Sequence, residues 1–136
     1  MKVADVMQRS VKTIAAEATV AEAILTLADA HISALPVIDA TGHMIGVVSS
    51  SDVLVAEAES GDAQARQRLI EGTAVREIMT PRPYTIAPDA ELREAAQQML
   101  YAEVHRLFVV DGDEVAGVVS TTDIVRAVAK AQVLVG

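Results

Sequence analysis

The sequence predicts an α/β (α+β) fold made of two tandem β-α-β-β-α units that pack with pseudo-two-fold symmetry. Three observations support this. The stretch GVVSSSD at residues 46–52 returns as GVVSTTD at residues 117–123. The hydrophobic patterns around the two copies come in the same order. The 136 residues are enough for one compact domain or for two small units that share a core.

The two halves align along nearly the whole chain. At an offset of 72 residues, Val3 pairs with Val75 and Met7 with Met79. The offset falls to 71 after Asp111, because the second copy has lost one residue from the loop that follows, where loss is easiest. A unit of this length that occurs only twice indicates a duplicated supersecondary structure whose halves cover each other's apolar faces.

Each half carries the same local signals in the same order. The lead-in pieces VADVM and AVREIM predict short helices, and KTIA and YTIA predict short extended pieces. A helix follows in each half. In the first, Val20, Ile24 and Leu27 recur at helical spacing, and Thr19 and Glu22 form a capping-box pattern. The second-half counterpart is ELREAAQQML.

A hairpin and a closing helix complete each half. ALPVID with MIGVVS, and LFVVD with VAGVVS, are apolar runs joined by loops that contain glycine, a pattern typical of hairpins. SSSDVLVAEAES and STTDIVRAVAKAQ predict the closing helices. We therefore expect a first repeat at residues 1–59, a polar helical linker at 60–73 and a second repeat at 74–133.

Composition narrows the classes of function. Half the residues are hydrophobic and 22% are charged, which favours a globular chain over a disordered one. There is no cysteine, so nothing indicates an oxidising compartment, and the cytoplasm is the expected location. Asp5 interrupts the region where a signal peptide needs an apolar run, and no uncharged stretch approaches the roughly 18–20 residues of a membrane span.

Nucleic acid is not an expected partner. The net charge of −8 repels phosphate backbones over most of the surface. Tyr84, Tyr101 and Phe108 are the only aromatic residues in the sequence, so no platform for stacking bases is evident.

The hydroxyl–Asp motif allows two interpretations. Ser49 and Ser120 can cap the closing helices, with Asp52 and Asp123 complementing the positive helix ends three residues later. The same geometry offers free N–H groups to an anion and a carboxylate to the two hydroxyls of a ribose. The two interpretations do not exclude each other.

The order strand, helix, hairpin, helix, with G-h-h-S-x-[ST]-D-h (h, hydrophobic) at the last helix start, resembles the CBS (cystathionine-β-synthase-type) domain. Two such units make the CBS pair, or Bateman module, and the resemblance covers roughly residues 1–132. LPVID and RLFVVD fit the second strand of that family. CBS pairs enclose clefts that commonly bind AMP, ADP, ATP, S-adenosylmethionine or NAD(H).

The resemblance implies a ligand site in each repeat. Asp52 and Asp123 would accept the ribose hydroxyls, and nearby backbone would contact adenine, which suits a cleft that reads a flat polar edge between apolar walls. The implied phosphate or ribose contacts are Ser49, Ser51, Ser120 and Thr122, and the adenine contacts lie around Thr13, Ile14, Thr85 and Ile86. No cofactor is required for this role.

The two halves differ in charge. The segment VHRLFVVD resembles the part of the AMP-activated kinase gamma subunit's CBS repeats in which a His-Arg pair meets phosphate, so His105, Arg106 and the adjoining Leu107 are candidate ligand contacts. Arginine offers a bidentate fork to phosphate. The alternative is that Arg106 is a solvated residue at a strand end. The matching positions, Ser33 and Ala34, bring no charge, so we expect the two sites to differ.

No catalytic or metal site is predicted. His31, His43 and His105 lack the spacing of a metal set and have no cysteine to join them, so His31 is expected at a helix end and His43 in a turn. SSSD is not a G-x-S-x-G elbow, and no partner pattern links a serine to a histidine. An enzyme is therefore not expected.

Two functional hypotheses remain open. One is a regulatory module that senses an adenosine-containing ligand, with AMP, ADP or ATP ahead of S-adenosylmethionine and NAD(H), and acts on a protein partner. The other is a ligand-free interaction module. Both predict a homodimer, because VLVA at residues 53–56 and IVRAVAKAQVLV at 124–135 leave apolar helix surface that one small domain cannot bury. In the family, two pairs join into a disk through such helices.

Overall fold

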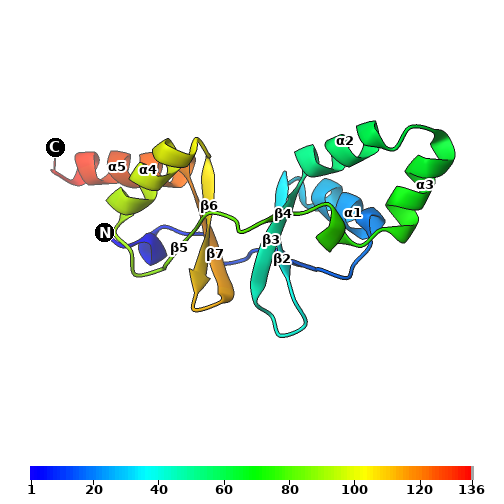
Figure 1. Ribbon diagram of the computed structural model, residues 1–136. Coiled ribbons are helices and arrows are strands. Elements are labelled where there is room, and N and C mark those ends of the chain that lie inside the picture. Colours follow the sequence, from blue (N-terminus) through cyan, green and yellow to red (C-terminus); the bar gives the residue numbers. More distant parts are fainter. Residues whose placement is uncertain (136) are drawn as a thin grey trace. The chain divides into compact units, whose positions relative to one another are not determined.

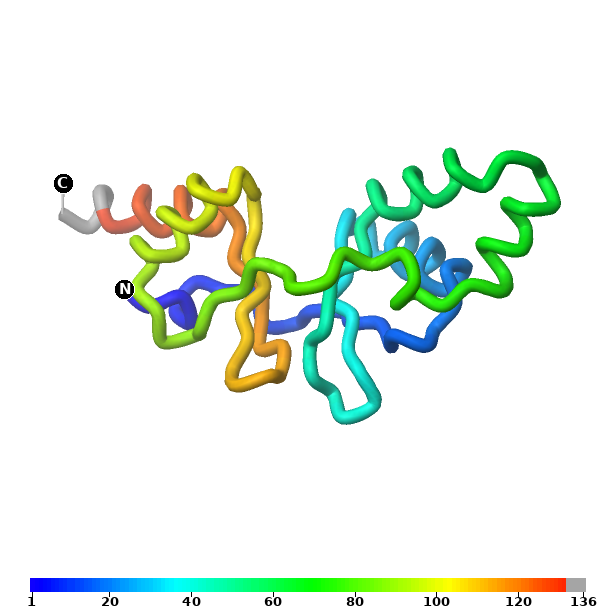
Figure 2. The backbone as a smooth tube through the Cα atoms, in the orientation of Figure 1, coloured from blue at the N-terminus to red at the C-terminus, as the bar shows by residue number. Residues whose placement is uncertain are grey.

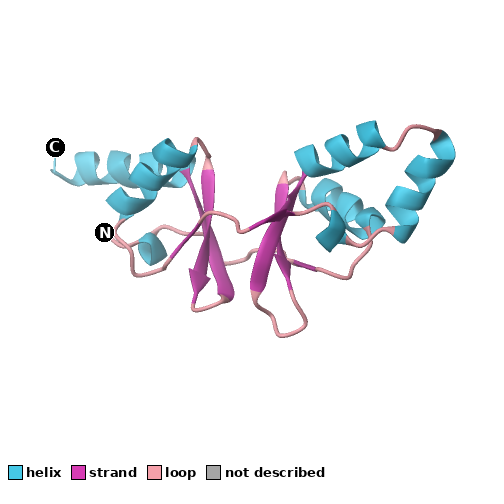
Figure 3. Cartoon of the chain, in the orientation of Figure 1, coloured by secondary structure: helices cyan, strands magenta, loops and turns pink. Residues whose placement is uncertain are grey.

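The computed structural model describes residues 1–135, with side chains described through Ala131. It confirms an α/β fold in which the pattern β-α-β-β-α occurs twice (Figure 1, Figure 3). The first series is β1 (Ile14–Ala15), α1 (Val20–Ala30), β2 (Ala34–Ile38), β3 (Met44–Ser49) and α2 (Ser50–Glu59). The second is β5 (Thr85–Ile86), α4 (Leu92–Ala102), β6 (Arg106–Asp111), β7 (Glu114–Ser120) and α5 (Thr121–Val135).

The first sheet has the order β1-β2-β3-β4, where β4 is Thr80–Pro81. Strand β1 is parallel to β2 because α1 forms the crossover between them, and β2 pairs with β3 as an antiparallel hairpin. Leu35 and Val37 alternate toward the helices and are fully buried with Val48. Ala23 and Leu27 of α1 complete this core from above the sheet.

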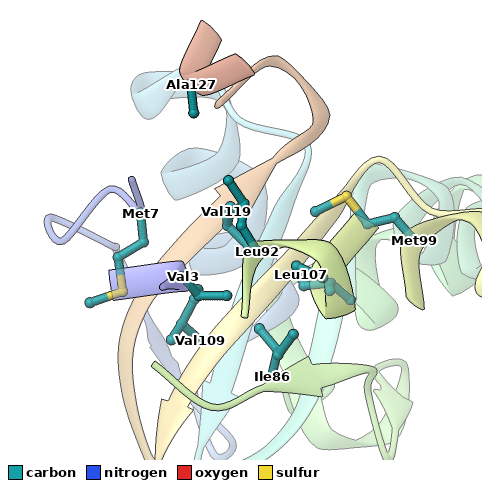
Figure 4. Close-up of a cluster of buried hydrophobic side chains, with 10 residues drawn as sticks. Val3, Met7, Ile86, Leu92, Met99, Leu107, Val109, Val119 and Ala127 are labelled. Atoms are coloured by element: carbon teal, nitrogen blue, oxygen red, sulfur yellow. The ribbon is translucent and has the colours of Figure 1, made fainter. Parts of the chain in front are cut away.

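The second sheet repeats the plan with the order β5-β6-β7. Leu107, Val109 and Val119 are fully buried, at the positions equivalent to the three core residues of the first sheet. Figure 4 shows them packed with Leu92 and Met99 of α4. Burial of a side chain of this size stabilises a fold by about 1.5–3 kcal/mol, so the same apolar positions hold each repeat together.

Each lead-in segment packs with the repeat that does not follow it directly in the sequence. One unit joins Met1–Val11 to Tyr84–Gly136, and the other is Lys12–Pro83. Val3 donates to Ala90 O at 2.9 Å, and Gln8 forms an isolated antiparallel bridge with Val118 of β7. Figure 2 shows this blue N-terminal segment running beside the orange strand β7. Each repeat is therefore completed by the lead-in segment of the other.

The lead-in pieces are shorter than predicted. Val3–Asp5 and Val75–Glu77 form single 3-10 turns, η1 and η2, in place of the expected helices. Their backbone groups find partners outside the segment: Ala4 donates to Pro88 O at 2.9 Å and Val75 to Ala18 O at 2.7 Å. Hydrogen bonds to another part of the chain replace those that would have continued a helix.

The connector contains one helix, α3 (Ala63–Gly72), whose N-cap Asp62 accepts from the Ala65 amide at 2.7 Å. This helix packs against α1 within the unit Lys12–Pro83. At the other end of the chain, the residues QVLV that close the expected apolar stripe lie outside the side chains that the structure describes. Within the described chain, no helix combines the length and the apolar character needed to cross a membrane.

Candidate functional site

The first hydroxyl–Asp motif forms a closed capping box at the start of α2. The Ser49 hydroxyl accepts from the Asp52 amide at 3.1 Å and donates to Asp52 Oδ2 at 3.0 Å. The Ser49 amide donates to the same Oδ2 at 2.8 Å. The predicted cap is therefore present, and it occupies only one of the two carboxylate oxygens of Asp52.

The second motif has the same geometry. The Ser120 hydroxyl accepts from the Asp123 amide at 3.1 Å and donates to Asp123 Oδ2 at 2.9 Å, and the Ser120 amide donates to Oδ2 at 2.8 Å. Two identical networks fix the Oδ1 atoms in the same orientation relative to their helices. Oδ1 is then the carboxylate oxygen with which either Asp can accept a further hydrogen bond.

A lead-in side chain reaches Oδ1 in both copies. Thr80 Oγ1 donates to Asp52 Oδ1 at 3.1 Å, and Gln8 Nε2 donates to Asp123 Oδ1 at 3.4 Å. Gln8 and Thr80 are equivalent in the duplication, 72 residues apart. Sequence reasoning missed both residues because they lie far from their motifs in the chain; the register of the repeat was the one signal that paired them.

The glycine that opens each motif lets the lead-in segment approach. A Cβ at Gly46 would lie 2.6 Å from Met79 Sδ and 2.9 Å from Thr80 O, and one at Gly117 would lie 2.6 Å from Gln8 O. Real Cβ atoms essentially never come this close. In G-h-h-S-x-x-D the glycine thus leaves room for the backbone of the lead-in segment. The Asp accepts a hydrogen bond from a side chain of that segment, Thr80 or Gln8.

The two carboxylates differ in their remaining surroundings. Asp123 is 5% exposed and forms an ion pair with Arg126, whose NH1 atom lies 3.5 Å from Asp123 Oδ1. Asp52 is half-buried, and the residue equivalent to Arg126 is Val55. Sequence reasoning also missed Arg126, although a cation three residues after an Asp on one helix is a recognisable signal.

A cavity of about 460 Å³ lies beside Asp123, between the lead-in turn and α5. Its volume falls within the usual range of small-molecule sites. Its lining combines acidic, basic and apolar side chains. The lining residues are Met1, Asp5, Val6, Asp123, Arg126, Ala127, Lys130 and Ala131.

The strand ladder brings some of the other predicted residues to the motifs. Arg106 is directly opposite Ser120 in the β6–β7 pair, as Ala34 is opposite Ser49 in the β2–β3 pair. Directly opposed residues share a face of the sheet. Because Leu107, one residue on, points into the core, Arg106 and Ser120 lie on the opposite face.

The remaining candidates are spread over several environments. Ile14, Ile86 and Leu107 have buried side chains in the hydrophobic cores, which leaves their backbones as contact groups. Ser33, Ser51, Thr122 and Thr13 are exposed, and Thr85 is half-buried on β5 opposite Phe108.

The backbone carbonyl of His105 accepts from the Thr121 amide at 2.9 Å, next to the second motif. His105 also lines a groove of about 680 Å³ between α4 and α5, whose lining does not include Arg106. The other histidines are placed as the sequence indicates: His31 is the C-cap of α1, and His43 precedes β3 in the hairpin loop.

Each repeat presents an apolar groove between its two helices. The groove between α1 and α2 measures about 320 Å³ and includes Leu54, and the one between α4 and α5 includes Val125. These residues are equivalent in the duplication and are 64% and 67% exposed. Leu25, Leu100, Tyr101 and Val128 are also exposed apolar or aromatic residues on these helices. The helix surface predicted to be apolar is therefore exposed in both repeats.

These features define a duplicated α/β module in which each repeat carries a hydroxyl–Asp capping box beside a crossing lead-in segment. The CBS domain family matches residues 3–59 and 75–130. The chain therefore belongs to the CBS domain family and contains a tandem CBS pair.

Among curated proteins, the chain is 31% identical over 130 residues to the chloroplastic CBS domain-containing protein CBSX1 of Arabidopsis thaliana. The match covers 80% of this chain and 55% of that protein. The chain thus spans about half the length of the CBSX relatives that it matches.

Solved CBS pairs share the fold over almost the whole chain. The crystal structure of CBSX2 in complex with AMP has a TM-score of 0.80 and 28% identity, covering 96% of this chain and 98% of that chain. The CBS domain pair of protein MJ0100, in complex with 5′-methylthioadenosine and S-adenosyl-L-methionine, has a TM-score of 0.77 and 25% identity, with the same coverage. Both of these similar CBS pairs hold adenosyl ligands.

Proposed function

We propose that this protein is a regulatory module that binds an adenosine-containing ligand and carries out no reaction. The observation that carries the proposal is the pair of Asp carboxylates, each fixed through Oδ2 by a capping box and each accepting through Oδ1 from one lead-in side chain. Binding of AMP in one similar CBS pair, and of methylthioadenosine and S-adenosylmethionine in another, supports it.

The carboxylates suit the hydroxyls of a ribose. A carboxylate accepts two hydroxyl donors, and the cap already holds Asp52 and Asp123 in place, so little conformational entropy is lost on binding. The hydrogen bonds from Thr80 and Gln8 are contacts that ribose hydroxyls would replace. AMP, ADP and ATP are the proposed ligands, ahead of S-adenosylmethionine and NAD(H). No bound cofactor is required.

The sequence assigns the phosphate to Arg106. It lies opposite Ser120 of the second motif, on the sheet face away from the core. Ala34 holds the equivalent position opposite Ser49 and has no charge. We therefore propose that the second repeat prefers phosphorylated ligands. His105, whose carbonyl accepts from the Thr121 amide at 2.9 Å, stays a proposed ligand contact beside Arg106.

The exposed helices support association with a second copy. Leu54 and Val125 occupy equivalent positions in two apolar grooves, and a contiguous apolar surface of this kind marks an interaction site. Ligand binding would then act through the geometry of a homodimer or through a docked protein partner. The second candidate function, a ligand-free dimerisation module, rests on the same grooves.

Thermal unfolding with AMP, ADP, ATP, S-adenosylmethionine and NADH tests the proposal. A ligand at a hundred times its dissociation constant adds about 2.7 kcal/mol of stability, which is readily measured as a rise in melting temperature. Asp52→Ala and Asp123→Ala are expected to weaken adenosine and its nucleotides alike, since all share the ribose. Stabilisation by none of the five compounds would favour the ligand-free alternative.

A further inference from the structure

The closing helices carry different charges at the positions that follow the motif Asp. Three residues after it, Arg126 in α5 replaces the Val55 of α2. Seven residues after it, Lys130 replaces Glu59. One face of α5 therefore carries two positive charges where α2 carries one negative charge, in a chain whose net charge is −8. This contrast lies outside the motif and outside the candidate residues that family resemblance implies.

The two cations line the same cavity as the motif carboxylate. Arg126, Lys130 and Asp123 all border the 460 Å³ cavity between the lead-in turn and α5. Residues four apart on a helix lie on one face, so Arg126 and Lys130 can direct their charged groups into a common space. The other charged side chain in the lining is Asp5, on the lead-in turn.

The Arg126 guanidinium contacts Asp123 but can also bind another group. One NH1 contact of 3.5 Å joins them, and the Arg126 side chain is 59% exposed. A guanidinium has five N–H donors in a planar fork, so several remain free for the oxygens of an anion. Lys130 is exposed and adds a point charge one helical turn further on.

We propose that Arg126 and Lys130 form an anion subsite that makes the Asp123 site selective for 5′-phosphorylated adenosyl ligands, whereas Val55 and Glu59 make the Asp52 site selective for uncharged nucleosides. The proposal rests on the proposed function, because it places the ribose at the Asp carboxylates. The buried carboxylate takes the hydroxyls, and the cations take the phosphate attached to the same sugar. At Asp52 the equivalent apolar and acidic side chains disfavour a phosphate.

Reciprocal substitution between the repeats provides the test. Arg126→Val and Val55→Arg each install the residue of the other copy, and Lys130→Glu does so one turn further on. Each is measured by calorimetric titration with adenosine and with AMP. Asp52→Asn and Asp123→Asn backgrounds isolate one site at a time.

A charge-assisted hydrogen bond to phosphate predicts that Arg126→Val weakens AMP at the Asp123 site by about ten- to a hundredfold, with adenosine changed by less than about twofold. Lys130→Glu is expected to have a smaller effect in the same direction. Val55→Arg is expected to strengthen AMP severalfold at the Asp52 site and to leave adenosine unchanged. Arg126→Lys keeps the charge without the fork and is expected to fall between arginine and valine.

One control variant and one variant of the rival cation separate the subsite from other causes. Arg76→Val removes a cation of similar exposure that pairs with Glu17, away from both motifs, and is expected to leave both ligands unchanged. Arg106→Ala tests the cation that the sequence assigns to the phosphate. An AMP-specific loss in Arg106→Ala with none in Arg126→Val would overturn the inference and leave the proposed function intact.

Two further outcomes also decide between the claims. Equal loss of adenosine and AMP in Arg126→Val, with normal thermal unfolding, would mean that Arg126 orients Asp123 and does not bind phosphate. Absence of adenosine and AMP binding in the unmodified protein would instead contradict the proposed function. The failures of the two claims are therefore distinguishable in one set of titrations.

Discussion

The two repeats place the same backbone around a carboxylate and then surround that carboxylate differently. In the first, Asp52 is half-buried and receives a hydroxyl from Thr80. In the second, Asp123 is almost fully buried and receives both the Gln8 amide and the Arg126 guanidinium. The cap hydrogen bonds agree to within 0.1 Å between the copies.

The comparison separates scaffold from specificity. The glycine that admits the lead-in segment and the Ser and Asp that cap the closing helix are the same in both copies, because the fold needs them twice. Positions that border the free Oδ1 atoms differ, because a site that discriminates between ligands depends on the groups around the shared element. The four predictions that follow test this division.

The largest expected effect is loss of self-association. Leu54→Glu together with Val128→Glu places a charge on the exposed apolar surface of each closing helix, and we expect a soluble monomer. Sedimentation velocity checks the oligomeric state. The single variants sharpen the comparison: if both repeats contribute to the interface, each weakens the dimer less than the pair does.

Arg76→Glu, which changes charge away from these helices, is the matched control and is expected to remain associated. A standard-size interface holds at tens of micromolar protein, so an unmodified chain that sediments as a monomer there would contradict the dimer hypothesis.

The second largest effect is expected at the motif glycines. Gly117→Ala puts a methyl group 2.6 Å from Gln8 O, a backbone atom, whereas the nearest atom to Gly46→Ala is the flexible Met79 sulfur. We expect both to destabilise the fold by about 1–3 kcal/mol. The larger loss is expected at Gly117, because its built Cβ lies 2.6 Å from a backbone oxygen, against 2.9 Å at Gly46. Urea unfolding measures the difference.

Gly72→Ala is the control for this pair. Gly72 ends α3 and has no atom within 4 Å of its built Cβ, so alanine there is expected to leave stability unchanged or to raise it by up to about 1 kcal/mol. Equal unfolding free energies for Gly117→Ala and the unmodified protein would show that the lead-in chain does not need the glycine.

Much of the fold could be predicted because the same sequence pattern occurs in both halves of the chain. Two copies of one hydrophobic pattern predicted the order of strands and helices, and the Ser-x-x-Asp spacing predicted both capping boxes. These are local features in which a residue and its partner lie a few positions apart.

The lead-in segments could not be assigned in the same way. Val3 and Met7 have helical spacing, yet the backbone of that segment bonds to Ala90 and Pro88, far along the chain. Periodicity reports which face of an element is apolar, but not which distant segment will cover it. For the same reason Gln8 and Thr80 stood outside the predicted site.

The third prediction concerns the motif carboxylates as structural groups. Asp123→Ala removes an acceptor from the Ser120 amide, the Gln8 amide and Arg126, in a buried position. Loss of a cap and of a buried acceptor costs about 1–3 kcal/mol. Asp52→Ala is expected to cost less because Asp52 is more exposed. Urea unfolding without ligand checks the order, and a larger loss for Asp52→Ala would contradict it.

The smallest effect is expected where the lead-in segment meets the start of α4. The bridge between Lys2 and Glu91 in the second repeat is equivalent to the bridge between Ala74 and Thr19 in the first. Thr19 caps α1 by accepting from the Glu22 amide at 3.2 Å, whereas Glu91 makes no such cap and instead pairs with Lys2 Nζ at 2.8 Å. The second repeat thus has an exposed ion pair where the first has a hydroxyl cap.

This ion pair predicts a pH dependence that Glu91→Thr should remove. The hydrogen bond and charge of Lys2 lower the pKa of Glu91, so its contribution to stability is present above the unfolded-state pKa and is lost as pH falls through the folded-state pKa. The pKa of Lys2 is raised by Glu91, so its contribution is lost only in strongly alkaline solution. Urea unfolding at neutral pH and at about pH 3 is expected to show a smaller acid-induced loss in Glu91→Thr than in the unmodified protein. Because both side chains are exposed, the difference is expected to be small and to shrink in high salt. An acid-induced loss of the same size in both proteins, measured at low salt, would mean that this ion pair does not stabilise the attachment of the lead-in segment.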